Sequence, residues 1–217
     1  MEIVNFATSD SIINQYVAEL RDVGAQANRS TFRHNLQRIG HMMAYEVSKT
    51  LQYSQKQIRT PLGTAQASTP DDHIVLATVF RAGLPFHHGF QNILDRADNA
   101  FISAFRKYKD RLNFEVMTEY IASPSIEGKT LILTDPMLAT GSSMELAYKA
   151  ILAKGNPGKV YFASIIASQP AIDYLQTKMP EESVCWTAAL DPELNEHSYI
   201  VPGLGDAGDL AFGTKED

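Results

Sequence analysis

Hydrophobic positions in the first third of the chain recur at helical spacing. Residues 11–23 carry apolar side chains on one stripe, and residues 31–51 repeat this pattern. We therefore predict a helix in each of these segments. The next stretch, residues 52–72, is polar, alternates only weakly and contains Pro61-Leu62-Gly63, so we interpret it as a hairpin arm or a loop.

From residue 73 onward, short apolar runs alternate with segments of helical period. We predict strands at residues 74–80, 100–105, 130–135, 160–167 and 184–190, and helices at residues 84–97, 142–154 and 171–178. This alternation is typical of βαβ units, which build a parallel sheet with helices on both faces. We therefore expect an α/β fold that binds its ligands beyond the carboxyl ends of the strands.

Composition and charge narrow the class of protein. The chain has 217 residues, of which 44% are hydrophobic and 20% charged, the balance of a single globular domain. Its net charge of -6 disfavours a broad surface for nucleic acid or an anionic membrane. The chain has a single cysteine, which argues against disulfides, and no long apolar run, which argues against a membrane span. Its first basic residue is Arg21, which argues against a signal peptide. We expect a cytoplasmic protein with no nucleic-acid or membrane partner.

The strongest local signal for chemistry lies in residues 130–155. An apolar strand ends at Asp135, and the loop after it reads Thr-Gly-Ser-Ser at residues 140–143, where a helix begins. Such a loop gathers backbone N–H groups at a helix N-terminus, which favours a phosphate. Composition alone leaves open that the hydroxyl residues only cap the helix, with Ser142 and Glu145 as a capping box.

Other nucleotide-binding patterns are absent or incomplete. No Walker A sequence occurs, which excludes a P-loop NTPase. Gly203, Gly205 and Gly208 form a G-x-G-x-x-G, but the nine residues after Gly208 are too few for the helix and acidic residue of a dinucleotide site. This glycine-rich tail has no lysine or arginine between Lys178 and Lys215, which suits a neutral ligand held by main-chain groups. A surface turn is the alternative.

Basic residues and histidines give weaker signals. Arg81 and the run at residues 106–111 follow predicted strands, where they would neutralise phosphates or lie on a solvated face. His87 and His88 are adjacent on a helix and point about 100° apart, which makes them a poor metal pair. We therefore predict no metal ligands among the side chains of the chain itself.

Taken together, these segments resemble the uracil phosphoribosyltransferase family, which belongs to the type I phosphoribosyltransferases. The similarity lies in Arg81-Ala82-Gly83, Arg106 within Phe-Arg-Lys-Tyr, the loop Asp-Pro-Met-Leu-Ala-Thr-Gly-Ser-Ser at 135–143, and residues 194–209. The last two segments are long and specific. The resemblance implies a type I phosphoribosyltransferase-like parallel sheet flanked by helices, with N-terminal helices, a β-hairpin arm and a C-terminal base-binding hood.

The resemblance also implies an organisation and an activity. It implies one domain over residues 1–217, with N-terminal helices and arm at 1–72, an α/β core at 73–190 and a base-binding tail at 191–217. The activity is pyrimidine salvage, in which the phosphoribosyl group of phosphoribosyl diphosphate (PRPP) is transferred to uracil, giving UMP and diphosphate. Mg2+ would be bound mainly through PRPP. A GTP effector and a homodimer or larger homo-oligomer also follow from the resemblance.

Individual residues are assigned to these ligands by the same resemblance. The catalytic positions would be Asp135, Arg106 and Asp206. The residues in contact with PRPP would be Arg81, Arg106, Asp135, Pro136, Met137, Leu138, Ala139, Thr140, Gly141, Ser142, Ser143 and Asp206. Those in contact with uracil would be Ile200, Gly205, Asp206 and Ala207.

The chain departs from the family pattern at three places. Ser142 stands where a second glycine is usual, and residues 78–80 read Thr-Val-Phe rather than Pro-Ile-Leu. The residues after Asp209 are Leu210-Ala211 rather than a charged or aromatic pair. Because Ser142 retains a backbone N–H, we expect the phosphate cradle to be preserved. Two alternatives remain open: a pyrimidine-sensing regulator that binds RNA, which the net charge of -6 disfavours, and a transferase for another nucleobase.

Overall fold

A central sheet organises the molecule. The computed structural model describes residues 1–108 and 114–215, and the side chains of 104–119 lie outside this description. Within the described part, the sheet has eight strands in the order β1-β10-β9-β7-β4-β5-β6, with β8 paired to β9. Its strands are β1 (Glu2–Asn5), β4 (Ile74–Phe80), β5 (Asp98–Tyr108), β6 (Phe114–Ala122), β7 (Thr130–Thr134), β8 (Met137–Leu138), β9 (Lys159–Ser168) and β10 (Val184–Asp191). All neighbouring pairs are parallel except β5 and β6.

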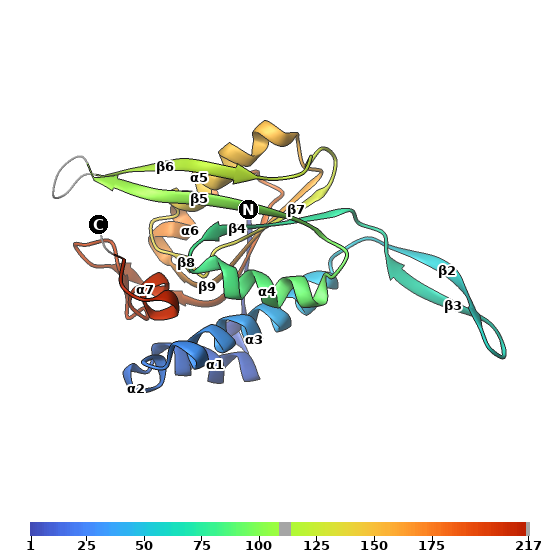
Figure 1. The fold of residues 1–217 in the computed structure, drawn as a ribbon, viewed down its shortest axis with the longest axis horizontal. Coiled ribbons are helices and arrows are strands. Elements are labelled where there is room, and N and C mark those ends of the chain that lie inside the picture. The colour runs from blue at the N-terminus through green and yellow to red at the C-terminus, as the bar shows by residue number, and fades with distance from the viewer. Residues whose placement is uncertain (109–113, 216–217) are drawn as a thin grey trace.

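Helices cover both faces of this sheet (Figure 1). One face carries α1 (Ile12–Arg21), α3 (Arg29–Ser48) and α4 (Gly83–Ile93), and the other carries α5 (Ser142–Ile151) and α6 (Gln169–Gln176). Shorter elements are α2 (Val23–Gln26), α7 (Ala207–Phe212) and the 3-10 turns η1 (Phe6–Thr8) and η2 (Leu152–Lys154). The predicted α/β fold with a parallel sheet flanked by helices is confirmed. No described helix has the length and apolar character needed to cross a membrane.

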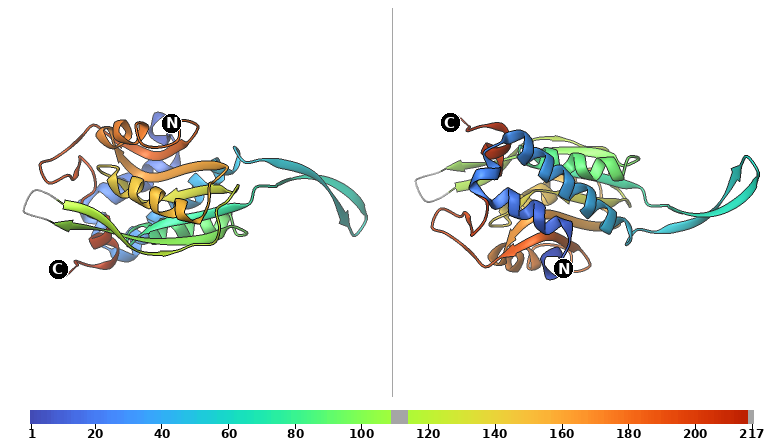
Figure 2. Two further views of the ribbon diagram at one scale, coloured as in Figure 1. Left: turned by 90° about the horizontal axis from the view of Figure 1, so that it is seen from above. Right: turned by 90° about the horizontal axis from the view of Figure 1, so that it is seen from below.

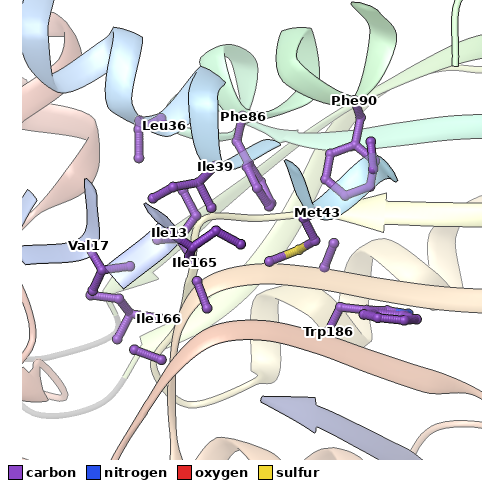
Figure 3. Packing of buried hydrophobic residues seen from close by; sticks show 14 of the residues in the cluster. Ile13, Val17, Leu36, Ile39, Met43, Phe86, Phe90, Ile165, Ile166 and Trp186 are labelled. Carbon is purple, nitrogen blue, oxygen red and sulfur yellow. The ribbon is translucent and has the colours of Figure 1, made fainter. Parts of the chain in front are cut away.

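The inner strands are apolar along their whole length because both faces are covered. All five residues of β7 are buried, and in β9 only the first residue is partly exposed. Alternate side chains enter two separate cores: Ile132 packs with α1, α3 and α4, whereas Leu131 and Leu133 pack with α5 and α6. Figure 3 shows the first core, in which α3 and α4 pack their apolar side chains against the sheet.

A two-stranded arm extends away from the sheet (Figures 1 and 2). It consists of β2 (Tyr53–Thr60) and β3 (Gly63–Pro70), which are antiparallel and joined by Pro61 and Leu62. The hairpin interpretation of residues 52–72 is therefore confirmed. The Leu62 side chain at its tip is 99% exposed. The arm and α7 lie at opposite ends of the molecule (Figure 1).

The predicted core elements are all present, with ends that shift by a few residues. Among the elements that were not predicted are the edge strand β1, the antiparallel strand β6 and helix α7 in the tail. Asp206 is the N-cap of α7, and its side chain accepts a hydrogen bond from the Asp209 N–H at 2.9 Å. A second pair of short strands, β11 (Glu193–Leu194) and β12 (Ile200–Val201), precedes α7. The alternative of a surface turn is therefore wrong for residues 207–212, which form a helix.

Candidate active site

The predicted phosphate cradle is the loop of residues 135–143, between β7 and α5. It is held from behind by β9: the Asp135 N–H donates to the Ala163 carbonyl at 3.0 Å, and two β9 N–H groups donate to the Pro136 carbonyl. The Ser168 hydroxyl at the end of β9 donates to the Ala139 carbonyl at 2.6 Å. Several fixed main-chain bonds therefore hold the cradle at the carboxyl edge of the sheet, where ligands bind in such folds.

Gly141 opens helix α5 in a conformation that favours glycine. It is the N-cap, with φ of 77°, and a Cβ there would lie 2.9 Å from the Leu175 Cγ. The predicted capping box is wrong, because Ser142 is the first helical residue and no side chain caps this helix. The Ser142 hydroxyl instead lies 2.7 Å from the Thr140 hydroxyl. The first turn of α5 thus presents hydroxyl groups at a helix N-terminus, a setting that favours an anion.

The charge of Glu145, in the first turn of α5, is balanced locally. Its carboxylate pairs with Lys149 at 2.7 Å and accepts a hydrogen bond from the Tyr174 hydroxyl. These bonds, that of Lys149 above all, lower the pKa of Glu145 below its usual value. The carboxylate is therefore ionised near the cradle but already paired with a cation, which reduces its repulsion of a phosphate.

A small cavity marks the cradle itself. It has a volume of about 30 Å³ and is lined by Asp135, Met137, Leu138, Ala139, Thr140, Gly141, Ser143 and Met144. The structure thus brings together most of the predicted PRPP loop around one cavity. A larger cavity of about 290 Å³ between α3, α4 and Phe212 contains none of the predicted site residues.

Arg81 comes directly after β4, the strand that pairs with β7 in the sheet. Its guanidinium donates to the Asp209 carboxylate at 2.9 Å and to the Gly213 carbonyl at 3.2 Å. The residues before it depart from the family pattern but have defined contacts: the Thr78 hydroxyl donates to the Thr134 carbonyl at 3.3 Å, and Phe80, which is 37% exposed, stacks on Phe101. Arg81 therefore lies beside the C-terminal tail, although the two are distant in sequence.

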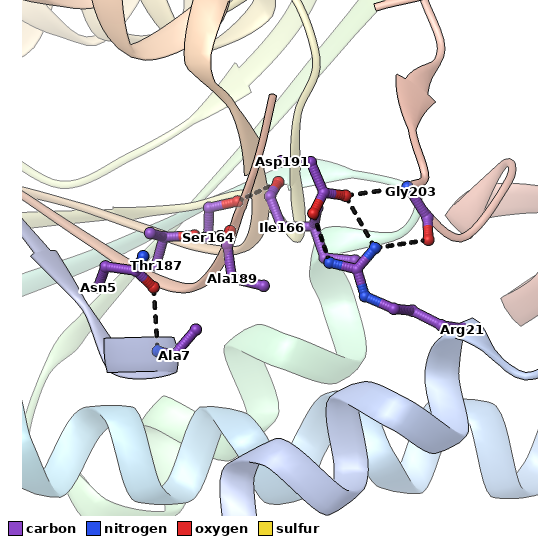
Figure 4. A network of polar contacts seen from close by, with 9 residues as sticks. All are labelled: Asn5, Ala7, Arg21, Ser164, Ile166, Thr187, Ala189, Asp191 and Gly203. Atoms are coloured by element: carbon purple, nitrogen blue, oxygen red, sulfur yellow. Dashed lines mark hydrogen bonds and ion pairs between the residues drawn. The ribbon is translucent and has the colours of Figure 1, made fainter. Parts of the chain in front are cut away.

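The tail is also fixed to helix α1 (Figure 4). The Arg21 guanidinium donates to both oxygens of Asp191, at 2.7 and 2.8 Å, and to the Gly203 carbonyl at 2.9 Å. The Gly203 N–H donates in turn to Asp191 at 2.9 Å. Because Asp191 ends β10 and Gly203 follows β12, this network connects the sheet, α1 and the loop that leads to the predicted uracil residues.

The four predicted uracil residues differ in exposure. Ile200 and Ala207 are 4% and 3% exposed and their side chains belong to the first core, whereas Gly205 and Asp206 are exposed. Any contact of Ile200 or Ala207 with a base would therefore run mainly through the main chain. This fits the expectation that the tail recognises a neutral ligand by backbone groups.

One predicted catalytic residue cannot be placed. Arg106 belongs to β5, but its side chain lies outside the described residues. Conversely, sequence reasoning missed Arg21, Asp191 and Asp209 as residues that hold the tail. Asp209 stands within the recognised Gly-Asp-Ala-Gly-Asp run, whereas the Arg21–Asp191 pair joins residues 170 apart and leaves no local signal.

The donor set suits a metal that arrives with its substrate. Among the described residues, no group of three or more His, Cys, Asp or Glu side chains is arranged to hold an ion. Asp135 contributes one carboxylate to the cradle cavity, beside hydroxyl and carbonyl oxygens. Mg2+ is commonly bound by one or two carboxylates together with substrate phosphates, so these residues fit such an ion.

Comparison with known proteins decides the family. A family model described as uracil phosphoribosyltransferase matches residues 7–214. The chain belongs to this family. A uracil phosphoribosyltransferase of Porphyromonas gingivalis is 59% identical over 99% of this chain and 100% of its own length. Another family member, from Methanothermobacter thermautotrophicus, is 39% identical over 87% of this chain and 86% of its own.

Solved structures agree with the fold of this family. The AQ2163 protein from Aquifex aeolicus superposes with a TM-score of 0.87 at 29% identity, covering 97% of this chain and 98% of its own. A hypoxanthine phosphoribosyltransferase from Staphylococcus aureus gives a TM-score of 0.50 at 12% identity, covering 75% of this chain and 76% of its own. The second likeness is evidence for the fold alone.

Proposed function

We propose that the chain transfers the phosphoribosyl group of PRPP to uracil, giving UMP and diphosphate in pyrimidine salvage. The observation that carries this proposal is the hydrogen bond between Arg81 and Asp209, residues 128 apart. Through this bond Arg81, which we expect to bind the diphosphate, contacts the tail that we expect to bind the base. Membership of the uracil phosphoribosyltransferase family supports the same activity, and it favours the transferase over a regulator or an enzyme for another base.

Each end of the substrate pair has a proposed set of residues. The loop at residues 139–143 would hold the 5′-phosphate, with Asp135 near the ribose hydroxyls. Arg81 and Arg106 would bind the diphosphate, with Asp206 also close to PRPP. Uracil would be surrounded by Ile200, Gly205, Asp206 and Ala207. This order follows the edge of the sheet from the cradle after β7 to the end of β4 and the tail.

The chemistry requires positioning more than a reactive side chain. A bond forms between uracil N1 and ribose C1′, the C1′–O bond breaks with its electrons leaving on diphosphate, and the N1 proton is released. The cradle loop would fix the phosphoribosyl group, which lowers the entropic cost of reaching the transition state. The arginines would stabilise the charge that develops on the departing diphosphate. No nucleophile on the protein is needed.

Three further features belong to the same proposal. Mg2+ would be held by PRPP with Asp135 nearby, and when bound it would neutralise charge on the leaving group. A homo-oligomer is supported by the projecting arm, whose exposed Ile58 and Leu62 side chains suit burial against another subunit. Light scattering tests the oligomer, and initial rates with and without GTP test the proposed effector.

The activity is tested with purified protein, PRPP, Mg2+ and each nucleobase in turn, following both diphosphate and nucleotide. We expect UMP from uracil and little turnover of the other bases. Arg81→Ala should remove most activity, whereas Arg96→Ala, which deletes the same charge just before β5 begins, should not. Reaction of hypoxanthine or adenine in place of uracil would contradict the assignment.

A further inference from the structure

Asp209 forms an ion pair with Arg81, a cation that the proposed reaction needs for binding diphosphate. One terminal nitrogen of Arg81 donates to the Asp209 carboxylate at 2.9 Å, and the other donates to the Gly213 carbonyl at 3.2 Å. A guanidinium binds phosphates with the same fork of N–H groups. Both terminal nitrogens of Arg81 are therefore engaged by the tail, and a diphosphate would have to compete with Asp209 and Gly213 for them.

The backbone of α7 is shaped to reach this arginine. A Cβ on Gly208 would lie 3.2 Å from the terminal nitrogen of Arg81 that binds Asp209, and 3.1 Å from an Asp206 carboxylate oxygen. Because Gly208 has no side chain, the first turn of α7 packs directly against the guanidinium. Asp206 caps this same turn, so Asp209 is presented to Arg81 from a defined position.

The contact is also weak enough to exchange. The side chains of Arg81 and Asp209 are 42% and 35% exposed, so water competes for both partners. Exposed ion pairs contribute little net stability, and a multiply charged phosphate ester is a stronger ligand for a guanidinium than one carboxylate.

We propose that Asp209 is a positioning residue that competes with diphosphate for Arg81. In the free protein Asp209 holds the guanidinium, and PRPP must displace Asp209 when it binds. This inference rests on the proposed function. Since Asp206 and Ala207, at the start of α7, are proposed uracil residues, displacement of Asp209 changes the contacts of the turn that carries them. Binding of diphosphate at Arg81 is thereby coupled to binding of uracil at the start of α7. Such a coupling is reciprocal, because each ligand changes the affinity for the other by the same factor.

Removing the competitor should strengthen binding. We would titrate the wild type and Asp209→Asn with PRPP in the presence of Mg2+, and separately with inorganic diphosphate, by isothermal titration calorimetry. We expect both ligands to bind about two- to fivefold more tightly to the variant, the range that loss of an exposed ion pair allows. Asp209→Ala, which also deletes the acceptor oxygen, should bind at least as tightly. A merely structural role for Asp209 would weaken binding instead.

Glu196→Gln is the matched control, because it removes one exposed negative charge from the same tail without touching Arg81. Its affinities should stay at the wild-type values. If Glu196→Gln tightens binding as much as Asp209→Asn does, the tighter binding is a general effect of charge, and competition between Asp209 and diphosphate is contradicted. Unchanged or weaker binding by both Asp209 variants, while the wild type forms UMP, overturns the competition alone. Failure of the wild type to bind PRPP overturns the proposed function with it.

Discussion

The ion pairs Arg21–Asp191 and Arg81–Asp209 both hold the C-terminal tail, and their surroundings differ. In the Arg21–Asp191 pair the carboxylate side chain is 6% exposed and both its oxygens are bound by the guanidinium. Asp191 also accepts the Gly203 N–H. In the Arg81–Asp209 pair the side chains are 42% and 35% exposed, and one carboxylate oxygen is bound.

This difference separates a permanent attachment from an exchangeable one. A buried carboxylate that loses its partner is left uncompensated, so the Arg21–Asp191 pair stays closed in the folded protein. The exposed pair loses little when water or a phosphate replaces one partner. The same tail is thus fixed where it leaves the sheet and releasable at α7, where the proposed diphosphate site begins.

The largest expected effect is that of Asp191→Ala. This change leaves Arg21 without its carboxylate partner and the Gly203 N–H without its acceptor, which should lower the free energy of unfolding by about 2–4 kcal/mol. Because the loop to Gly205 loses its anchor, the KM for uracil should also rise. Denaturant unfolding and steady-state kinetics measure the two effects.

Asp209→Ala is the natural comparison for that variant, since it removes the same group from the exposed pair. Its free energy of unfolding should fall by at most about 1 kcal/mol. Equal losses in Asp191→Ala and Asp209→Ala would show that burial does not distinguish the two pairs.

Arg21→Lys should have a smaller effect than Asp191→Ala. Lysine keeps the charge but cannot reproduce two parallel bonds to Asp191 together with the bond to the Gly203 carbonyl. We expect a loss of about 1–2 kcal/mol in unfolding free energy. The KM for uracil should rise more than the KM for PRPP. A larger rise for PRPP would place this network at the other end of the site.

The sequence was sufficient for five strands of the sheet, β4, β5, β7, β9 and β10, and for the strand, loop and helix of the cradle, because these depend on local patterns. Apolar runs define β4, β7, β9 and β10, and the strand, loop and helix around residues 130–155 follow each other directly in the chain. Only one detail of the cradle was wrong, since Gly141 rather than Ser142 caps α5. The uracil and PRPP assignments themselves came from the family resemblance and remain predictions.

The contacts that hold the tail could not be predicted in this way. Arg21 and Asp191 lie 170 residues apart, and Arg81 and Asp209 lie 128 apart, so no spacing along the chain connects them. Helix α7 was missed because its residues have a low helix propensity. Two of its six residues are Gly208 and Asp209, and Gly213 follows directly after it. Its N-cap, Asp206, is the signal that was available.

Salt should affect the two pairs differently. Raising the ionic strength from about 0.05 M to about 0.5 M shortens the Debye length from roughly 14 Å to roughly 4 Å, which screens exposed charges far more than buried ones. The stability difference between the wild type and Asp209→Ala should therefore shrink toward zero, whereas the difference for Asp191→Ala should persist. Thermal unfolding at the two salt concentrations measures both differences. A salt-sensitive Asp191→Ala difference would mean that its carboxylate is open to solvent.

The smallest expected effect is that of Gly208→Ala. The new methyl group would approach the Arg81 guanidinium to 3.2 Å, which requires the end of that side chain to move by a few tenths of an ångström. An exposed, exchangeable arginine can make this movement, and alanine is a better helix former than glycine by up to about 1 kcal/mol. We therefore expect the free energy of unfolding to stay within about 0.5 kcal/mol of the wild type. Calorimetry should show slightly tighter diphosphate binding, because the crowded pair is easier to displace. A loss of stability above about 2 kcal/mol would instead mean that Arg81 is held rigidly against α7, and the contrast between the fixed and the releasable pair would no longer hold.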